Sequence, residues 1–299
     1  MKECNLDLRS AMPPSELVLD ANGGIYHLGL QPDQIADKII VVGDPGRVQR
    51  ISNKFDSIDH KVSRREFVTH TGRIGDENIT ALSTGIGVDN IDIVLNELDA
   101  LRNIDLKSRM VKPELNPLQI VRLGTCGALH RDIPVGSFVN SSYALGLDGV
   151  MHYYGCSYED DEKELVSNFM KHTDWNIEGI RPYAIRGSEK LGNLFTKGFT
   201  KGITATACGF YGPQGRRLRL PLAMNELNDA MSTFKFKDLI LANYEMESSS
   251  LFGLGAALGH ECTTVCVAVA NRLRNEFLED YKPAIDQLID TVLEGFTSH

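Results

Sequence analysis

The chain has 299 residues, of which 42% are apolar and 24% charged, and this composition is that of an ordinary globular protein with a sizeable core. Its formal net charge is −9, from 40 acidic and 31 basic side chains. This balance argues against nucleic acid and anionic membranes as partners, because both require a basic surface. A small anionic ligand is still allowed, since a few arginines gathered in one place are enough to bind it.

The cysteines and the apolar stretches indicate a cytoplasmic protein. No CxxC pair occurs, so we expect buried free thiols rather than metal ligands or disulfides at the six cysteines, Cys4, Cys126, Cys156, Cys208, Cys262 and Cys266. The first residues contain no apolar segment typical of a secretory signal. The longest apolar stretches are too short to cross a bilayer, so no membrane partner is expected.

The predicted elements alternate between strands and helices after an irregular N-terminal extension, residues 1–24. We expect residues 25–299 to form one domain. Short apolar runs predict strands at 38–42, 79–84, 119–123, 136–140, 202–208 and 263–270. Helical spacing of apolar residues predicts helices at 88–102, 245–258 and 282–296. Two less regular stretches, 103–117 and 153–198, are expected to be surface excursions within the same domain.

The character of these strands predicts the fold class. They are apolar throughout, which is typical of strands that are covered on both faces. Interleaved with helices, they predict an α/β fold with a central, mixed and largely buried sheet flanked by helices.

Three of the predicted strands end in glycine-rich loops, at 43–47, 83–87 and 124–127. Ligands of open α/β sheets gather at the carboxyl ends of strands, and successive backbone amides can hold an anion. The first loop also offers Arg47, and the second opens a helix, whose N-terminus favours negative charge. Arg122 lies within an apolar strand and therefore needs a counter-charge, which could be an oxyanion ligand or a carboxylate of the protein. Each loop taken alone could be an ordinary turn.

Two further stretches carry groups suited to a nucleoside. Residues 243–250 are expected to begin a helix, and their two glutamates could accept hydrogen bonds from a vicinal diol, or could simply favour the helix dipole. Residues 210–216 combine aromatic, glutamine and arginine side chains, which suit a planar base but are also found in surface loops.

Taken in order, these motifs resemble a known family. The chain is similar to the nucleoside phosphorylases of the class that includes uridine phosphorylases and the hexameric bacterial purine nucleoside phosphorylases. The resemblance covers most of the chain after residue 25 and rests on short motifs at 26–30, 43–47, 65–67, 83–87, 122–127, 210–216, 243–248 and 269–272. It implies a nucleoside phosphorylase-like α/β/α sandwich and a pentosyltransferase of nucleoside catabolism.

The resemblance assigns roles to individual residues. It implies phosphate binding by Gly43, Arg47, Arg65, Arg122 and Thr125, with Arg65 supplied by a neighbouring subunit. It implies ribose binding by His27 of the neighbouring subunit and by Glu245, Met246 and Glu247. It implies base binding by Phe210, Gln214, Arg216 and Arg272. The catalytic residues would be Arg47, Arg122, Arg216 and Glu247.

The base-binding residues favour uridine as the substrate. Purine-specific members carry a Ser-Asp pair where this chain has Asn271 and Arg272, so no acid is present to protonate a purine ring. The resemblance therefore implies reversible phosphorolysis of uridine to uracil and ribose 1-phosphate, in pyrimidine salvage. The alternatives are a purine nucleoside phosphorylase, a hydrolytic nucleosidase and a non-catalytic nucleoside-binding protein on the same scaffold.

The resemblance also bears on cofactors and assembly. It implies no organic cofactor, inorganic phosphate as co-substrate, and a homo-oligomer, dimer or hexamer, with active sites shared between subunits. Some members bind a monovalent cation such as potassium near residues corresponding to Glu66, Ile86 and Asn90, although Asn90 stands where those members have a serine ligand. Cys126 replaces a threonine of many uridine phosphorylases, and Gly215 replaces a glutamate.

Overall fold

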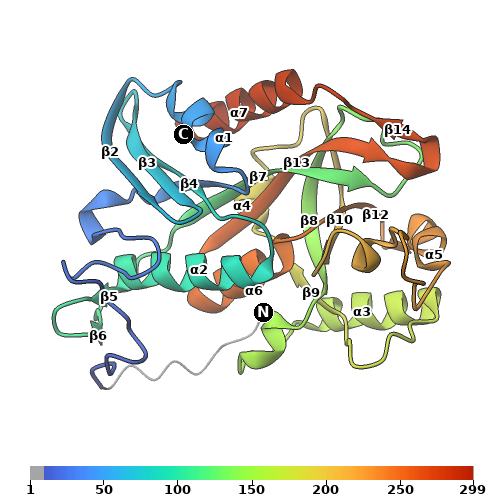
Figure 1. Ribbon diagram of the computed structural model, residues 1–299, viewed down its shortest axis with the longest axis horizontal. Helices are drawn as coiled ribbons and strands as arrows, with labels where there is room; N and C mark the ends of the chain where they lie inside the picture. The colour runs from blue at the N-terminus through green and yellow to red at the C-terminus, as the bar shows by residue number, and fades with distance from the viewer. Residues whose placement is uncertain (1–9, 299) are drawn as a thin grey trace.

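The computed structural model describes residues 10–298, which form three layers, with a mixed sheet between two layers of helices (Figure 1). The described α-helices are α1 (Pro45–Ser52), α2 (Val88–Asn103), α3 (Asp160–Thr173), α4 (Glu189–Gly192), α5 (Leu227–Thr233), α6 (Ser248–Leu258) and α7 (Lys282–Thr297). The strands of the main sheet are β1 (Lys38–Val42), β2 (Ser57–Arg64), β3 (Phe67–Ile74), β4 (Glu77–Ser83), β7 (Gln119–Ala128), β8 (Phe138–Leu147), β9 (Tyr183–Arg186), β10 (Phe199–Ala207), β11 (Lys235–Phe236), β12 (Leu239–Glu245), β13 (Glu261–Asn271) and β14 (Glu276–Phe277). A separate small hairpin joins β5 (Ile104–Asp105) to β6 (Met110–Val111).

The order of strands along the sheet is β11-β12-β10-β8-β13-β7-β1-β4-β3-β2. Neighbours pair in parallel around β1, while β2, β3 and β4 pair antiparallel, so the predicted mixed sheet is confirmed. One pairing does not follow the linear order, because β12 also pairs with β7. This pairing closes the strands β7, β12, β10, β8 and β13 into a ring.

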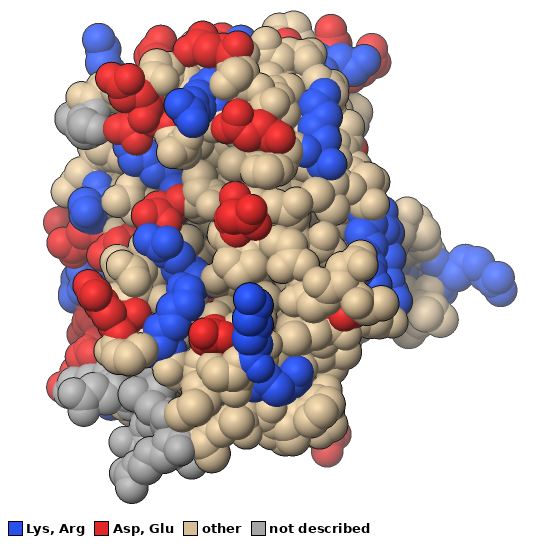
Figure 2. Space-filling view, turned by 90° about the vertical axis from the view of Figure 1, so that its left-hand side faces the viewer, with Lys and Arg blue, Asp and Glu red and all other residues tan. Residues whose placement is uncertain are grey.

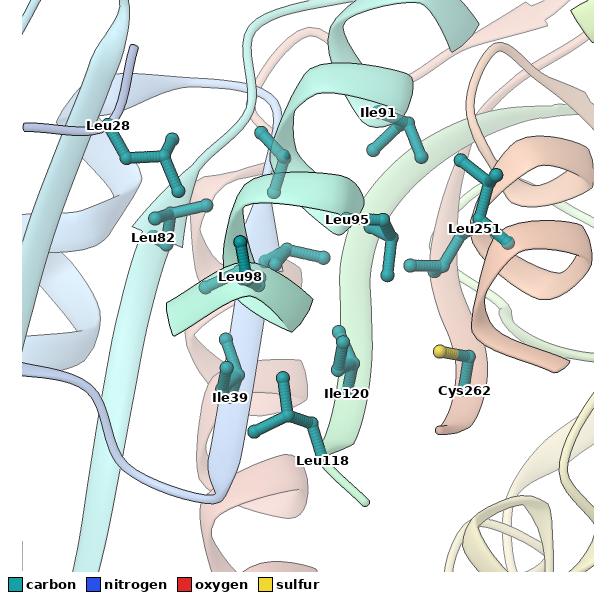
Figure 3. Packing of buried hydrophobic residues seen from close by; sticks show 14 of the residues in the cluster. Leu28, Ile39, Leu82, Ile91, Leu95, Leu98, Leu118, Ile120, Leu251 and Cys262 are labelled. Atoms are coloured by element: carbon teal, nitrogen blue, oxygen red, sulfur yellow. The ribbon is translucent and has the colours of Figure 1, made fainter. Parts of the chain in front are cut away.

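Both faces of the sheet are buried under helices, as the apolar strands predicted. In β1, Ile39 and Val41 pack into the core beneath α2 and α6, whereas Ile40 and Val42 pack into the core beneath α1 and α7. Figure 3 shows the first of these cores, where leucines and isoleucines of α2 lie between the strands and α6. Alternate side chains of one strand thus contribute to two different cores. The carboxyl ends of the strands emerge between the two helix layers.

The structure corrects several predicted boundaries. Residues 153–198 are not an irregular excursion, because they contain α3, β9 and α4. The helix α3 begins with a capping box between Glu159 and Glu162, and it buries Leu165 and Phe169. Residues 57–74 form the β2–β3 hairpin, which the sequence patterns did not predict. In β2 exposed and half-buried residues alternate, since this edge strand is not covered on both faces.

The cysteines follow the prediction in part. Cys126, Cys262 and Cys266 are buried free thiols, as expected. Cys208 is free but exposed, because it lies just beyond the end of β10, and Cys156 is disulfide-bonded, so the expectation was wrong for both residues. Cys4 lies outside the described residues.

The surface near β2 has no broad patch of one charge. Figure 2 shows that basic and acidic side chains are interspersed over this face. Within residues 10–298, no helix is both long and apolar enough to cross a bilayer.

Candidate active site

The first glycine loop is the start of a helix. Gly43 follows β1, and Pro45 is the first residue of α1. The Asp44 carboxylate caps this helix by accepting a hydrogen bond from the Gly46 N–H at 2.9 Å. The cap turns Arg47 inward, where it is buried and donates from Nη1 to the carbonyl of Leu123 at 3.3 Å. The guanidinium of Arg47 therefore lies against β7, the strand that carries Arg122.

The charge of Arg47 is poorly compensated. Burial lowers the pKa of Arg47, and the nearby positive charge of Arg122 lowers it further, although Asp44 acts in the opposite direction. Among the described residues, no carboxylate lies within ion-pair distance of Arg47. A bound oxyanion would stabilise this guanidinium, which has further N–H groups to donate.

Arg122 has carboxylate partners within the protein. Its Nη1 lies 3.2 Å from Oε2 of Glu245, and its Nη2 pairs with Oε2 of Glu247. Nη1 also lies 3.5 Å from Sγ of Cys266. Burial opposes the charge of Arg122, but Glu247 and Glu245 outweigh it and raise its pKa. The sequence left open whether Arg122 pairs with a bound oxyanion or with a carboxylate of the protein. In the structure it pairs with two carboxylates, Glu245 and Glu247.

Glu245 lies at the end of β12 rather than in a helix, which corrects the expectation that residues 243–250 begin one. Its carboxylate accepts hydrogen bonds from Oγ1 of Thr206 at 2.6 Å and from the N–H groups of Glu247 and Ser248, each at 2.9 Å. These bonds fold the chain into a tight turn before α6 begins at Ser248. Met246 is half-buried within this turn.

Glu247 is buried and held at both carboxylate oxygens. Arg122 donates to Oε2, and the N–H of Gly87 donates to Oε1 at 2.8 Å. Burial, together with the neighbouring charge of Glu245, raises the pKa of Glu247, while Arg122 and the Gly87 N–H act in the opposite direction. The second glycine loop therefore does face a negative charge, and that charge is the Glu247 carboxylate.

The third predicted loop is part of a strand. Residues 124–127 continue β7, because they pair with β13 on one side, and Gly127 pairs with Tyr244 of β12 on the other. Thr125 is half-buried, three residues beyond Arg122. Since β1 and β7 are parallel neighbours, Gly43 and Thr125 emerge at the same edge of the sheet.

The base-binding candidates form a closed cluster at the same edge. Arg216 donates to Oε1 of Gln214 at 2.5 Å and lies over the ring of Phe210, 3.7 Å from its centroid. Arg272 donates to the carbonyls of Gln214 and Gly215 and so holds the backbone of this segment. Burial, followed by the charge of Arg272, lowers the pKa of Arg216.

A cavity of about 10 Å³ adjoins this cluster, with room for about one water molecule. It is lined by Gly127, Ala128, Gln214, Arg216, Tyr244, Ala270 and Arg272.

His27 and Arg65 lie together, away from the contacts of the other candidates. The Tyr26 ring lies edge-on to the His27 ring, and the guanidinium of Arg65 lies 5.9 Å from the same tyrosine ring. Nδ1 of His27 lies 2.6 Å from Oε1 of Glu97 and donates to that carboxylate. Arg65 is exposed and lies in the turn between β2 and β3, whereas Arg47 lies in α1 and Arg122 in β7.

The residues named for a monovalent cation are neighbours. A Cβ atom added at Gly85 would lie 2.4 Å from Nδ2 of Asn90 and 3.2 Å from Cγ of Glu66. Ile86 is exposed between them. Within residues 10–298, no group of three or more acidic, histidine or cysteine side chains is arranged to hold a metal ion.

The structure thus joins Arg47, Arg122, Glu245 and Glu247 in one buried centre, with Gln214 and Arg216 beside it. Sequence reasoning did not single out Thr206, Cys266 or the amide of Gly87 as partners of this centre. A threonine in an apolar strand gives no such signal, because its partner is distant in sequence. By contrast, Asp44 followed by Pro45 is a helix-start pattern that could have identified α1.

A cluster of buried arginines and glutamates at the carboxyl ends of the strands of an α/β fold is typical of an enzyme active site. Residues 37–294 match the model of the phosphorylase superfamily, and the chain belongs to this family. A uridine phosphorylase of Haemophilus influenzae is 30% identical over 259 residues, which cover 85% of this chain and 88% of the relative. A DeoD-type purine nucleoside phosphorylase of Oceanobacillus iheyensis is 26% identical, over 80% of this chain and 84% of the relative.

A solved structure agrees with these matches. A nucleoside phosphorylase of Trypanosoma brucei, described as showing uridine phosphorylase activity, superimposes with a TM-score of 0.87 at 30% identity. The superposition covers 95% of this chain and all of that one. The family and the fold class expected from the sequence are therefore confirmed.

Proposed function

We propose that the chain is a uridine phosphorylase, which converts uridine and phosphate reversibly into uracil and ribose 1-phosphate. The observation that carries this proposal is the adjacency of two groups of residues. The cluster of Gln214, Arg216 and Arg272 shares its cavity with Gly127 and Tyr244, and Tyr244 precedes Glu245 of the buried arginine–glutamate centre. A base, a ribose and a phosphate would thus be held in one line along the edge of the sheet.

In this proposal the phosphate binds beside Arg47. Arg47 and Arg122 carry two positive charges close together, and only Arg122 has carboxylate partners among the described residues. A phosphate dianion would pair with the guanidinium of Arg47 and would be positioned for attack on C1′ of the ribose. Gly43 and Thr125 would contribute at the same edge, and Arg65 would come from a neighbouring subunit.

Glu247 would bind the ribose hydroxyls, with Met246 packing against the sugar and His27 of a neighbouring subunit accepting the 5′-hydroxyl. The C1′–N1 bond would break as the ribose gains oxocarbenium character, and phosphate would bond to C1′. The electron pair of that bond would leave with uracil. Arg216 and Gln214 would stabilise the negative charge that develops on the departing base, so that positioning and fixed charges supply the rate enhancement.

The environment of Asn271 favours a pyrimidine over a purine. Asn271 is fully buried, and its Nδ2 donates to the carbonyls of His130 at 2.9 Å and Ile133 at 2.8 Å. Its Oδ1 accepts from the N–H of Arg274 at 3.2 Å. The acid of the purine-specific members corresponds to residue 272, and neither the Asn271 amide nor the guanidinium of Arg272, which donates to the carbonyls of Gln214 and Gly215, can protonate a purine. A hydrolytic nucleosidase is disfavoured because water needs no counter-charge of the kind that Arg47 offers.

Product analysis with uridine, thymidine, inosine and adenosine, each with and without phosphate, tests the proposal. We expect phosphate-dependent cleavage of uridine and little cleavage of inosine. Replacing Arg216→Ala should lower kcat/KM for uridine by about 10²–10³-fold, with a much smaller change in the KM for phosphate. The neighbouring Arg217 is exposed, so Arg217→Ala is the matched control. Cleavage without phosphate, or an equal loss of both parameters in Arg216→Ala, would contradict the assignment.

We further propose a cytoplasmic homo-oligomer without an organic cofactor. The exposed Arg65 and the partly exposed side chain of His27 are the features that a neighbouring subunit would use.

A further inference from the structure

The backbone amide of Gly87 lies where it can control the sugar-binding carboxylate. Gly87 is the N-cap of α2, and its N–H donates to Oε1 of Glu247 at 2.8 Å. Both residues are buried, so this hydrogen bond to a charged group is shielded from water. We propose that Gly87 is a positioning residue for ribose recognition, which acts by holding Glu247. This inference rests on the proposed function.

Only glycine can present its amide in this way. Gly87 has φ 105° and ψ 160°, a region of backbone conformation that is essentially restricted to glycine. A Cβ atom at this position would also lie 2.6 Å from Oδ1 of Asp89. Any side chain would therefore displace the backbone, and the direction of the N–H would change with it.

The second donor to Glu247 comes from a different part of the fold. Arg122 in β7 donates to Oε2, while Gly87 follows β4 and donates to Oε1. Donors at both oxygens fix the plane of the carboxylate. Each oxygen retains a further lone pair, so the fixed carboxylate can accept one hydroxyl at each oxygen. The 2′- and 3′-hydroxyls of a ribose present two donors at the spacing this requires.

The two donors predict a specificity effect. If the carboxylate rotates freely, it can still bind one hydroxyl but no longer holds two at once. A ribonucleoside should then lose more than a 2′-deoxyribonucleoside, which presents only the 3′-hydroxyl. The ratio of kcat/KM for uridine to that for 2′-deoxyuridine therefore reports on the fixation of Glu247, and general damage to the fold does not alter it in this direction.

The test compares Gly87→Ala with Gly75→Ala. Gly75 also has positive φ, at 56°, but lies in the β3–β4 turn with nothing near its Cβ position. In Gly87→Ala we expect kcat/KM for uridine to fall by about 10- to 100-fold, the effect of losing one hydrogen bond to a charged group. The uridine to 2′-deoxyuridine ratio should fall by about fivefold or more, and Gly75→Ala should leave the ratio unchanged.

If Gly87→Ala does not fold, as judged by circular dichroism, the double variant Gly87→Ala with Asp89→Ala removes the oxygen that the new methyl group would meet. An unchanged ratio in a folded variant, with an active wild-type enzyme, overturns the positioning role and leaves the proposed function intact. A wild-type protein that does not cleave uridine with phosphate overturns both. If the uridine to 2′-deoxyuridine ratio falls equally in Gly87→Ala and Gly75→Ala, the positioning role of Gly87 is also refuted.

Discussion

Removing the positive charge of Arg122 should destabilise the fold strongly. In Arg122→Met, the carboxylates of Glu245 and Glu247 remain side by side, with side-chain exposures of only 1% and 4% and no cation between them. Breaking a buried ion pair in this way costs about 3–5 kcal/mol. For a chain of this length, the melting midpoint should fall by about 5–8 °C.

The sign of the pH dependence follows from the same geometry. Without Arg122, burial and the neighbouring charge of Glu245 raise the pKa of Glu247 further above that of an unfolded glutamate. The folded variant then holds a proton that the unfolded chain releases. Its deficit in stability is therefore small below the unfolded pKa of about 4.3 and grows as the pH rises through the folded pKa.

Thermal and urea denaturation of the wild type, Arg122→Met and Arg122→Met with Glu247→Gln would measure these effects between pH 5 and 8. The added Glu247→Gln should recover part of the loss, because it removes one of the two unpaired charges. The control is Arg102→Met, since the Arg102–Asp37 pair at 2.9 Å is largely exposed and should contribute less than about 1 kcal/mol. Two results would contradict a strongly stabilising role of Arg122. The first is a loss in the free energy of unfolding for Arg122→Met no larger than that for Arg102→Met. The second is a further loss of similar size when Glu247→Gln is added to Arg122→Met.

Two other predictions concern buried positions that are not among the candidate site residues. Burial lowers the pKa of His70, whose Nδ1 lies 2.7 Å from Oγ of Ser52, so the folded protein should lose stability as the pH falls below about 6.5. Melting curves between pH 8 and 5.5 should show a smaller slope for His70→Gln, and an unchanged slope would contradict this assignment. In Gly146→Ala the new methyl group would lie 2.4 Å from the buried ring of Tyr183, and overpacking should cost about 1–3 kcal/mol in urea denaturation. Gly149→Ala, where no atom lies within 4 Å, should be nearly neutral, and equal losses in the two variants would exclude overpacking as the cause.

The central layer of the fold could be predicted because its signals are local. Residues 38–42 are apolar throughout and form β1 with the expected bounds, and residues 282–296 carry an apolar stripe and form α7 almost as expected. The β2–β3 hairpin was missed because β2 carries charged residues at an open edge of the sheet. The segment 153–198 was misread because its charges cover the outer face of α3, whose apolar face is only a few residues wide.

The individual residues of the candidate site could be predicted from the sequence, but the hydrogen bonds and ion pairs between them could not. The sequence identified Arg122 as a charge in need of a partner, and the family pattern identified Glu247. That they pair with each other depends on strands more than a hundred residues apart in sequence, and no local pattern reports such a contact. The mutual bonding of Gln214 and Arg216 is likewise a property of folded side chains, although their spacing was visible.

The ring of β7, β12, β10, β8 and β13 has a consequence for how the protein is made. The ring is complete only when β13 lies between β7 and β8, and β13 ends at residue 271. During synthesis, β7 and its arginine therefore emerge well before the last strand that encloses them. The nascent chain must therefore leave Arg122, Glu245 and Glu247 without their enclosing strand until β13 has been translated, so the ring cannot close before residue 271 has been added.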